Sequence, residues 1–230
     1  MISYLEGFRD GRPWADMVEV IGPDPVDLIM TDLTGWAVST PVDLGRQLLD
    51  KGARLSRHAH TMHCDLTDLS ALPPLEGPAP EGFRFIPAHE RTAEDMFESW
   101  VAAFPPGHPD HSATRDDQQA FLEELVPLVA GKLIGELLPC SAVALDTDGD
   151  VVAGVLVNGF KGTPWISEVF RHPERSPRGL GAHLLRHVQL RAAAGGLTEM
   201  GLAVTYANHA KNTYARIGFT ITSTSMTVII

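Results

Sequence analysis

Cysteine and basic side chains are scarce in this sequence of 230 residues. The two cysteines, Cys64 and Cys140, exclude a disulfide framework and favour a reducing, cytoplasmic setting. There are 18 Lys and Arg against 29 Asp and Glu, a net charge of −11, whereas nucleic acids and anionic membrane surfaces select basic proteins. No apolar run approaches the roughly 18 residues of a membrane span, and no secretory signal is visible. We therefore expect neither a nucleic-acid nor a membrane partner.

Four of the 17 prolines lie in one segment, 72–82 (LPPLEGPAPEG). Because proline lacks a backbone donor and favours extended chain, this segment predicts a semi-rigid linker. The linker separates an N-terminal accessory segment, 1–78, from a domain over 79–230. The composition as a whole, 44% hydrophobic and 20% charged, is that of ordinary globular proteins.

The hydrophobic periodicity beyond the linker predicts a mixed α/β domain. Thr92 is the expected N-cap of a helix, and Asp148-Gly149 predicts the turn of a hairpin. In the N-terminal segment, 24–33 and 36–40 are each compatible with a helix or a strand. The other expected strands are 53–66, 83–86, 141–145, 151–157, 165–170, 200–204 and 219–230, and the expected helices are 42–52, 92–103, 114–129, 179–194 and 207–217.

Charge is distributed unevenly along the chain. The segment 90–124 holds nine acids against two arginines, and 171–191 holds five arginines against one acid. A basic patch in an acidic protein suggests a local anion site, although two solvated helix faces of opposite charge explain the same pattern.

A glycine turn lies within the basic segment, between a strand and a helix. The first N–H groups of a helix lack intrahelical partners and carry partial positive charge, so Arg178, Gly179 and Gly181 could hold a pyrophosphate. The alternative is a turn that packs a helix closely on a sheet. A dinucleotide fingerprint is excluded because Leu184 occupies its third glycine position, and no Gly-Lys-Ser/Thr follows as in a Walker loop.

The segment SPRGLGAHLL, 176–185, resembles the acyl-CoA-binding motif Q/R-x-x-G-x-G/A of the GCN5-related N-acetyltransferases. Arg178, Gly179 and Gly181 match the motif, whereas Ser176 stands where Gln or Arg is usual. The resemblance implies that the pyrophosphate of acetyl-CoA, the co-substrate, is held by a run of six residues: Arg178, Gly179, Leu180, Gly181, Ala182 and His183.

The segment 202–219, LAVTYANHAKNTYARIGF, resembles a second signature of the same family. Ala210, Tyr214, Gly218 and Phe219 match in register, and Asn208, expected to contact the cofactor, stands one position late. The two resemblances together imply the acyl-CoA N-acyltransferase fold, a mixed, mostly antiparallel twisted sheet flanked by helices. They also imply transfer of an acetyl group to an amine by direct attack in a ternary complex.

Family resemblance also assigns roles around the thioester. Tyr214 matches the tyrosine that commonly protonates the leaving thiolate, with a packed aromatic on a helix as the alternative. The developing oxyanion needs a donor, usually a strand amide where two parallel strands diverge. Val169 and Phe170, at the end of the strand before the glycine turn, are the candidates.

Glu168 is the candidate general base, because a carboxylate in the otherwise apolar run ISEVF could have a raised pKa. An outward-facing strand residue is the alternative, and His172 and His209 are weaker candidates for the base. By resemblance, 90–124 covers the first two helices, which often shape the acceptor pocket. The acids there favour a cationic acceptor, either a small-molecule amine or a peptide.

The N-terminal segment resembles the closing part of a degenerate acetyltransferase lobe, as in tandem-lobe members of the family, and it lacks a cofactor motif. A homodimer is compatible with the sequence. No metal site is expected, because His58, His60, His63 and Cys64 have no second cluster to complete four ligands. The rival function is a non-catalytic acyl-CoA-binding or sensing domain, favoured by Ser176 and by the displaced Asn208.

Overall fold

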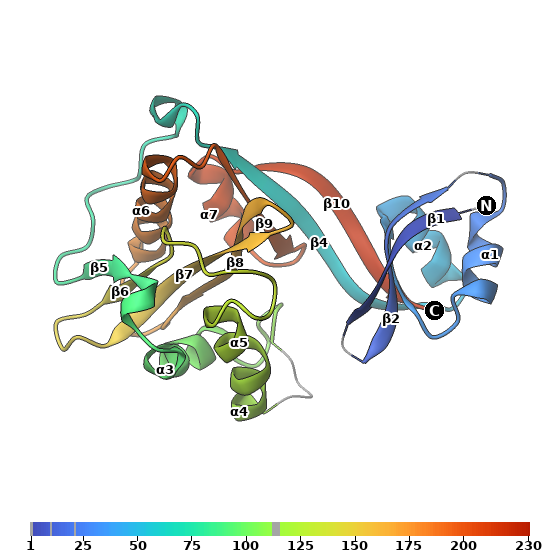
Figure 1. Ribbon diagram of the computed structural model, residues 1–230, viewed down its shortest axis with the longest axis horizontal. Helices are drawn as coiled ribbons and strands as arrows, with labels where there is room; N and C mark the ends of the chain where they lie inside the picture. Colours follow the sequence, from blue (N-terminus) through green and yellow to red (C-terminus); the bar gives the residue numbers. More distant parts are fainter. Residues whose placement is uncertain (1, 10, 21, 112–115) are drawn as a thin grey trace. The chain divides into compact units, whose positions relative to one another are not determined.

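The computed structural model describes residues 2–9, 11–20, 22–111 and 116–230. The chain forms two compact units (Figure 1). The first consists of Met1–Thr61, Val204–Tyr206 and Ile221–Ile230, and the second of Met62–Ala203 and Ala207–Thr220. The proline-rich segment 72–82 lies inside the second unit, and a domain boundary at 78/79 stays a prediction.

The first unit is a small sheet with helices α1 (Pro25–Asp32) and α2 (Val42–Asp50). Its strand order is β1-β2-β3-β10-β4, with β2 and β3 parallel and β10 antiparallel to β3. The bounds are β1 Ile2–Arg9, β2 Arg12–Val20, β3 Ala37–Pro41, β4 Arg54–Asp65 and β10 Thr220–Ile229. The helix at 42–52 and the strand at 53–66 are thus confirmed, and 24–33 is helical. The β1–β2 hairpin was not expected from the sequence.

The first unit has its own core, in which the two helices pack against the sheet. Helix α1 contributes Ile29, with Leu33 directly after its end, and α2 contributes Leu48. The sheet contributes Val38 from β3 and Val228 from β10. All five are at most 2% exposed. The unit therefore buries an apolar cluster independently of the second unit.

The second unit carries the larger sheet, in the order β4-β9-β8-β7-β6-β5. The pairs β5–β6, β6–β7 and β7–β8 are antiparallel, and β8–β9 is parallel. This confirms a mixed, mostly antiparallel sheet with helices. The bounds are β5 Arg84–Pro87, α3 Ala93–Ala103, α4 Asp117–Ala120, α5 Val126–Val129, β6 Ala142–Leu145, β7 Val151–Phe160, β8 Thr163–Arg171, α6 Leu180–Ala194, β9 Glu199–Thr205 and α7 Ala210–Arg216.

Helix α3 begins as the sequence predicts, because Thr92 and Asp95 form a reciprocal capping box. The single helix expected over 114–129 is instead two short helices, α4 and α5, joined by a π-helical turn, Phe121–Leu125. Pro127 explains the irregularity, since it has no N–H to donate to the preceding turn. Thr114 and Arg115, the expected first residues, lie outside the described part of the chain.

The core of the second unit lies between the sheet and helices α3 and α5. Met96 and Trp100 of α3 and Leu128 of α5 pack against residues of β6, β7 and β8, among them Phe170. In the described residues, no helix is long and apolar enough to cross a membrane.

Phe170 requires a glycine opposite it on the neighbouring strand. Gly154 pairs with Phe170 across β7 and β8, and a Cβ on Gly154 would lie 2.3 Å from Phe170 Cε1. Gly154→Ala should therefore destabilise the protein by about 1–3 kcal/mol through overpacking. Gly159→Ala in the same strand is the matched control, because its Cβ would meet only ordinary contacts at 3.7 Å or more. Urea unfolding measures both, and equal stability of the two variants would contradict the prediction.

Candidate functional site

Strand β8 contains one residue more than its partner β7 at the centre of their pairing. Glu168 lies opposite Leu156 and Ile166 lies opposite Val157, so Ser167 is the extra residue of a β-bulge. A bulge interrupts the ladder and turns the following backbone groups and side chains in a new direction. The bulge therefore determines what Glu168 and the residues after it face.

A buried amide holds the bulge in place. Asn158, 0% exposed, donates from Nδ2 to the carbonyl oxygens of Leu128 (3.1 Å) and Gly135 (2.9 Å). Because both Nδ2 hydrogens are used, Oδ1 must be the acceptor, and Ser167 Oγ lies 2.5 Å from it. The hydroxyl of the extra residue is thus fixed to the interior of the unit.

The parallel pairing of β8 with β9 ends at the bulge. Trp165 pairs with Gly201 and Ile166 with Leu202, whereas β8 continues to Arg171. Backbone groups of β8 beyond Ile166 that are turned away from β7 are therefore not used in this parallel ladder.

The N–H of Val169 is one of these groups. It donates to Glu168 Oε1 at 3.1 Å, while the N–H of His172 donates to Val152 O of β7 at 2.8 Å. N–H groups alternate in direction along an antiparallel pair, so the N–H of Phe170 is turned toward β7 as that of His172 is. Of the two expected oxyanion donors, the N–H of Val169 is therefore the one turned away from β7. The Phe170 side chain is buried in the core.

Glu168 lies in a setting that raises its proton affinity. Burial among protein atoms raises its pKa to about 7, and the charges of Glu124 and Asp110 act in the same direction. Hydrogen bonds from Trp100 Nε1 (3.1 Å) and from the N–H of Val169 partly oppose this effect. Glu168 nevertheless keeps partial solvent exposure. A carboxyl group that titrates near neutrality and still reaches solvent is suited to proton transfer.

Tyr214 of α7 is 8% exposed. Burial raises the pKa of its phenol, and the charges of Glu168 and Asp110 raise it further. The structure thus brings together the two residues that the sequence proposed as acid and base, and the phenol stays protonated where the carboxyl ionises.

Asn208 uses both ends of its amide within the chain. Its Nδ2 donates to Asp110 Oδ2 at 2.7 Å, and its Oδ1 accepts from the N–H of Ala210 at 2.8 Å. The residue therefore opens α7 and joins it to the loop that follows α3. Its expected contact with the cofactor stays a prediction.

Helix α6 begins at the glycine turn. Gly179 is its N-cap with φ 95°, which favours glycine. A Cβ on Gly181 would meet nothing within 4 Å, so packing does not explain this glycine. Leu180 is buried while Arg178 is exposed, and Gly181, Ala182 and His183 are half-buried. Packing therefore leaves space at Gly181 at the helix start, and the contact of this turn with the pyrophosphate of acetyl-CoA stays a prediction.

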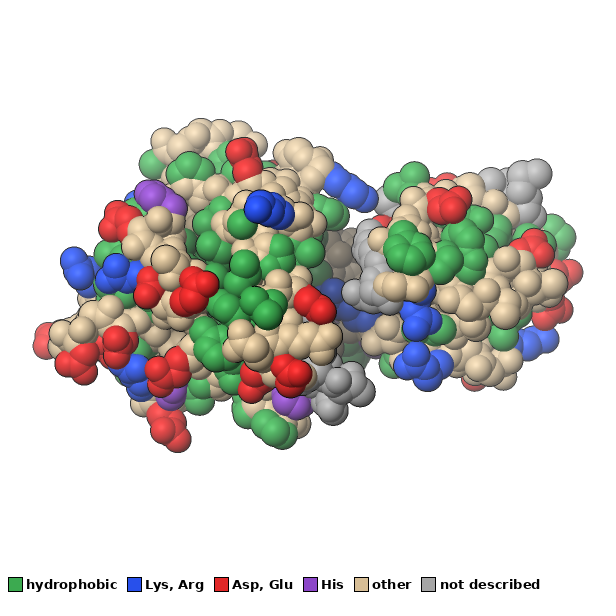
Figure 2. All heavy atoms as spheres, turned by 60° about the horizontal axis from the view of Figure 1, so that its bottom comes forward, with side chains coloured by type: hydrophobic (Ala, Val, Ile, Leu, Met, Phe, Trp, Pro, Cys, Tyr) green, Lys and Arg blue, Asp and Glu red, His purple; other side chains and the backbone are tan. Residues whose placement is uncertain are grey.

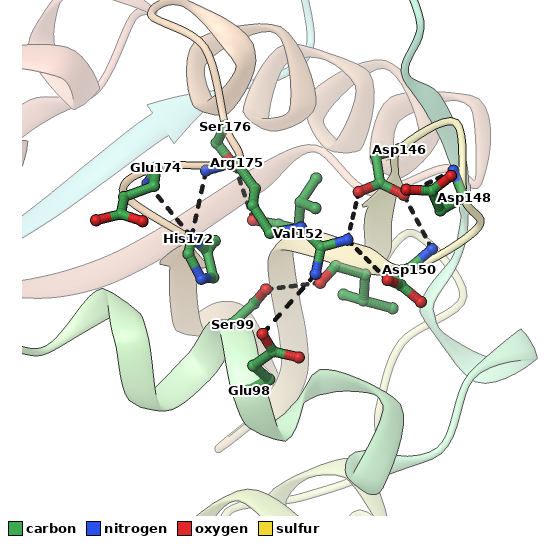
Figure 3. A network of polar contacts seen from close by, with 11 residues as sticks. Glu98, Ser99, Asp146, Asp148, Asp150, Val152, His172, Glu174, Arg175 and Ser176 are labelled. Atoms are coloured by element: carbon green, nitrogen blue, oxygen red, sulfur yellow. Dashed lines mark hydrogen bonds and ion pairs between the residues drawn. The ribbon is translucent and has the colours of Figure 1, made fainter.

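Side chains tie the loop before the glycine turn to the sheet and the β6–β7 hairpin (Figure 3). Arg175 Nη2 contacts the carboxylates of Asp146 (2.5 Å) and Asp150 (2.7 Å). Ser176 Oγ donates to Val152 O at 2.8 Å, and His172 Nδ1 accepts from the N–H of Arg175 at 3.2 Å. Ser176, which departs from the family motif, thus has a structural role.

These contacts correct the charge reading of the sequence. Arg175 is paired with Asp146 and Asp150, and Arg171, Arg186 and Arg191 donate to carbonyl oxygens. Arg178 is the remaining arginine of the segment 171–191, and its side chain is exposed. Asp95 and Asp116 of the acidic segment cap helices. Much of the uneven charge therefore stabilises the fold.

The histidine-rich strand β4 has structural partners. The His58 ring stacks on Tyr206 at 4.1 Å, and His60 Nδ1 lies 2.8 Å from Thr224 Oγ1. Within the described residues, no group of three or more His, Cys, Asp or Glu side chains could hold a metal ion. Cys64 and Cys140 are buried free thiols, and burial raises the pKa of Cys140 to about 11.

A mixed sheet with a bulged strand, a neighbouring parallel strand and a glycine turn leading into a helix defines an acyl-CoA N-acyltransferase fold. The chain belongs to the acetyltransferase (GNAT) family, whose model matches residues 93–219. This family carries out acetyl transfer, and its members generally use acetyl-CoA. No curated protein matches the sequence.

Solved structures share the fold at low identity. A GCN5-related N-acetyltransferase from Sphaerobacter thermophilus is 20% identical with a TM-score of 0.60, and the match covers 84% of this chain and 58% of that one. One from Kribbella flavida is 16% identical with a TM-score of 0.52, covering 88% and 70%. A tandem GNAT protein from the clavulanic acid biosynthesis pathway is 14% identical with a TM-score of 0.56, covering 94% and 74%.

The contact between Trp100 and Glu168 is testable. Trp100→Phe keeps an aromatic ring but removes a donor that stabilises the ionised carboxylate, so the pKa of Glu168 should rise above about 7. Phe97→Leu, which alters the same core without touching that bond, is the control. Carbon-13 NMR titration of labelled glutamate carboxyls measures the midpoint. An unchanged or lower midpoint in Trp100→Phe would show that the hydrogen bond from Trp100 does not stabilise the ionised form of Glu168.

Proposed function

We propose that the chain transfers an acetyl group from acetyl-CoA to the amine of a cationic acceptor, by direct attack in a ternary complex. The observation that carries this proposal is the convergence, at the β8 bulge, of a carboxyl with a pKa of about 7, a buried protonated phenol and a backbone N–H turned away from the antiparallel ladder. Family membership and the open glycine turn at α6 support it.

The residues divide the proton transfers between them. Acetyl-CoA supplies an activated thioester, so no covalent enzyme intermediate is needed. Glu168 accepts the proton that the attacking amine loses, and Tyr214 donates one to the departing sulfur. The N–H of Val169 stabilises negative charge on the carbonyl oxygen. The N–H groups at the start of α6, with Arg178, bind the pyrophosphate.

Negative charge near Glu168 favours a positively charged acceptor. Asp110 and Glu124 both act on Glu168 electrostatically. Other acids of the 90–124 segment are exposed, and Figure 2 shows acidic side chains gathered on the face of the second unit turned toward the viewer. Such a field attracts a cationic amine, either a small molecule or a peptide, with an attraction that salt screens.

Gly181 provides a test of the cofactor site. Because a Cβ there meets no protein atom within 4 Å, Gly181→Val should fold with unchanged stability while its side chain blocks the helix start. Acetyl-CoA affinity should fall at least roughly tenfold, with an intermediate loss in Gly181→Ala. Calorimetry measures affinity, and thermal unfolding without ligand checks the fold. Full affinity in a folded Gly181→Val variant would place the cofactor elsewhere.

Tyr214 provides a test of the reaction. A screen of thiol release from acetyl-CoA over polyamines, aminoglycosides, amino acids and peptides identifies an acceptor. With it, Tyr214→Phe should lower turnover by roughly 10²- to 10⁴-fold and leave acetyl-CoA affinity nearly unchanged. Tyr206→Phe, at a tyrosine 48% exposed in the first unit, is the control. Equal turnover in wild type and Tyr214→Phe would remove the phenol from the mechanism. Tight acetyl-CoA binding with no thiol release for any acceptor would favour a sensing domain.

A further inference from the structure

A side chain of the protein already occupies the backbone donor that an acyl group needs. The N–H of Val169 donates to Glu168 Oε1 at 3.1 Å. This N–H is turned away from β7, in the part of β8 beyond its pairing with β9. Of the N–H groups of Val169 and Phe170, only that of Val169 is turned away from the ladder with β7. The carboxylate of Glu168 accepts a hydrogen bond from this N–H.

The other oxygen of the same carboxylate has a separate anchor. Glu168 Oε2 accepts from Trp100 Nε1 at 3.1 Å. Trp100 is 6% exposed and packs in the core of the second unit, so its ring is fixed. Oε1 can therefore leave the N–H of Val169 while Oε2 stays bound to Trp100. The carboxyl has a defined position both with and without the Val169 bond.

We propose that the Glu168 carboxylate and the carbonyl oxygen of an acyl-CoA compete for the N–H of Val169, so that acyl-CoA binding is coupled to proton uptake at Glu168. A single N–H serves one acceptor well, and an ionised carboxylate is a stronger acceptor than a thioester carbonyl. The competition therefore weakens when Glu168 is protonated. This proposal rests on the proposed function, because it takes the carbonyl oxygen to bind at Val169.

The sign of the coupling follows from the hydrogen bonds. The Val169 bond stabilises the charged form of Glu168 and lowers its pKa, so loss of the bond on ligand binding raises the pKa above its free value of about 7. Protonated Glu168 thus accompanies the bound state, and affinity falls as pH rises through about 7. Among the described residues, the titratable groups that interact electrostatically with Glu168 are Asp110, Glu124 and the Tyr214 phenol. The first two disfavour its ionisation, and the phenol, with its raised pKa, stays protonated in this range.

The coupling also affects the proton transfer. Arrival of the acyl group releases Oε1 of Glu168 from the N–H of Val169. Only the fraction of Glu168 that stays ionised in the acyl-CoA complex can accept the proton of the amine. Turnover should therefore reach its maximum at a higher pH than the titration of Glu168 in the free protein.

Calorimetry with two matched ligands tests the proposal without any turnover. Acetyl-CoA carries the carbonyl, and S-ethyl-CoA has a similar size without it. Titrations between about pH 6 and about pH 8, in buffers of different ionisation enthalpy, report both affinity and protons taken up. As the pH rises over this range, the affinity for acetyl-CoA should fall roughly tenfold relative to the affinity for S-ethyl-CoA. Binding of acetyl-CoA should also take up more protons than binding of S-ethyl-CoA. Titration of the coenzyme A phosphates is common to both ligands and cancels in the comparison.

Glu168→Gln is the decisive variant, because its amide keeps the size of the side chain and an oxygen for Val169 but does not titrate. The pH dependence of the difference between the two ligands should disappear in it, whereas Glu98→Gln, at an exposed acid of α3, should retain it. Equal proton uptake for both ligands in the wild type, or a difference that persists in Glu168→Gln, overturns the proposal while the proposed function stands. Failure of both ligands to bind overturns the proposed function itself.

Discussion

One extra residue in β8 determines the direction in which the candidate site residues of that strand face. Inserting Ser167 into the pairing with β7 shifts the register by one residue, and in a strand with a period of two such a shift changes which face each residue presents. The ladder groups that the bulge disrupts must still be paired inside the protein. Ser167 Oγ and the buried Asn158 amide provide that pairing. Asn158 also binds the carbonyl oxygens of Leu128 and Gly135, so the bulge is tied to α5 and to the loop after it.

Two titratable groups of the candidate site, Glu168 of β8 and Tyr214 of α7, have pKa values that burial raises. Glu168 and Tyr214 are both shifted toward their protonated forms, chiefly by burial. Burial brings the pKa of the Glu168 carboxyl to about 7, and it moves the pKa of the Tyr214 phenol further above neutrality. A carboxyl that ionises near pH 7 and a phenol that keeps its proton are the combination that the proposed acetyl transfer to an amine requires. The charge of Glu168 contributes to the raised pKa of Tyr214.

Much of the charge in this protein stabilises the fold. The acids that cap α3 and α4 satisfy N–H groups at the helix starts. The two acids that hold Arg175 fix the loop that leads to the glycine turn (Figure 3). Against this structural background, the exposed Arg178 and the open backbone at Gly181 are the features of the turn that packing leaves unexplained. Counting charges along the sequence cannot make this distinction, because an ion pair joins residues that are far apart in the chain.

The sequence by itself determined the mixed α/β class, most elements of the second unit and the position of the glycine turn. These depend on local signals: hydrophobic periodicity, the Thr92 cap, the Asp148-Gly149 turn and the spacing of Gly179 and Gly181. Only the tertiary structure decided the rest. The β8 bulge, the turning of the Val169 N–H away from β7, the bond between Asn208 and Asp110 and the anchoring of Glu168 by Trp100 all depend on residues from different elements. The β1–β2 hairpin and the π-helical turn before Pro127 also escaped the sequence patterns. Local periodicity carries no information about register between strands or about which buried groups meet, and those two properties define this site.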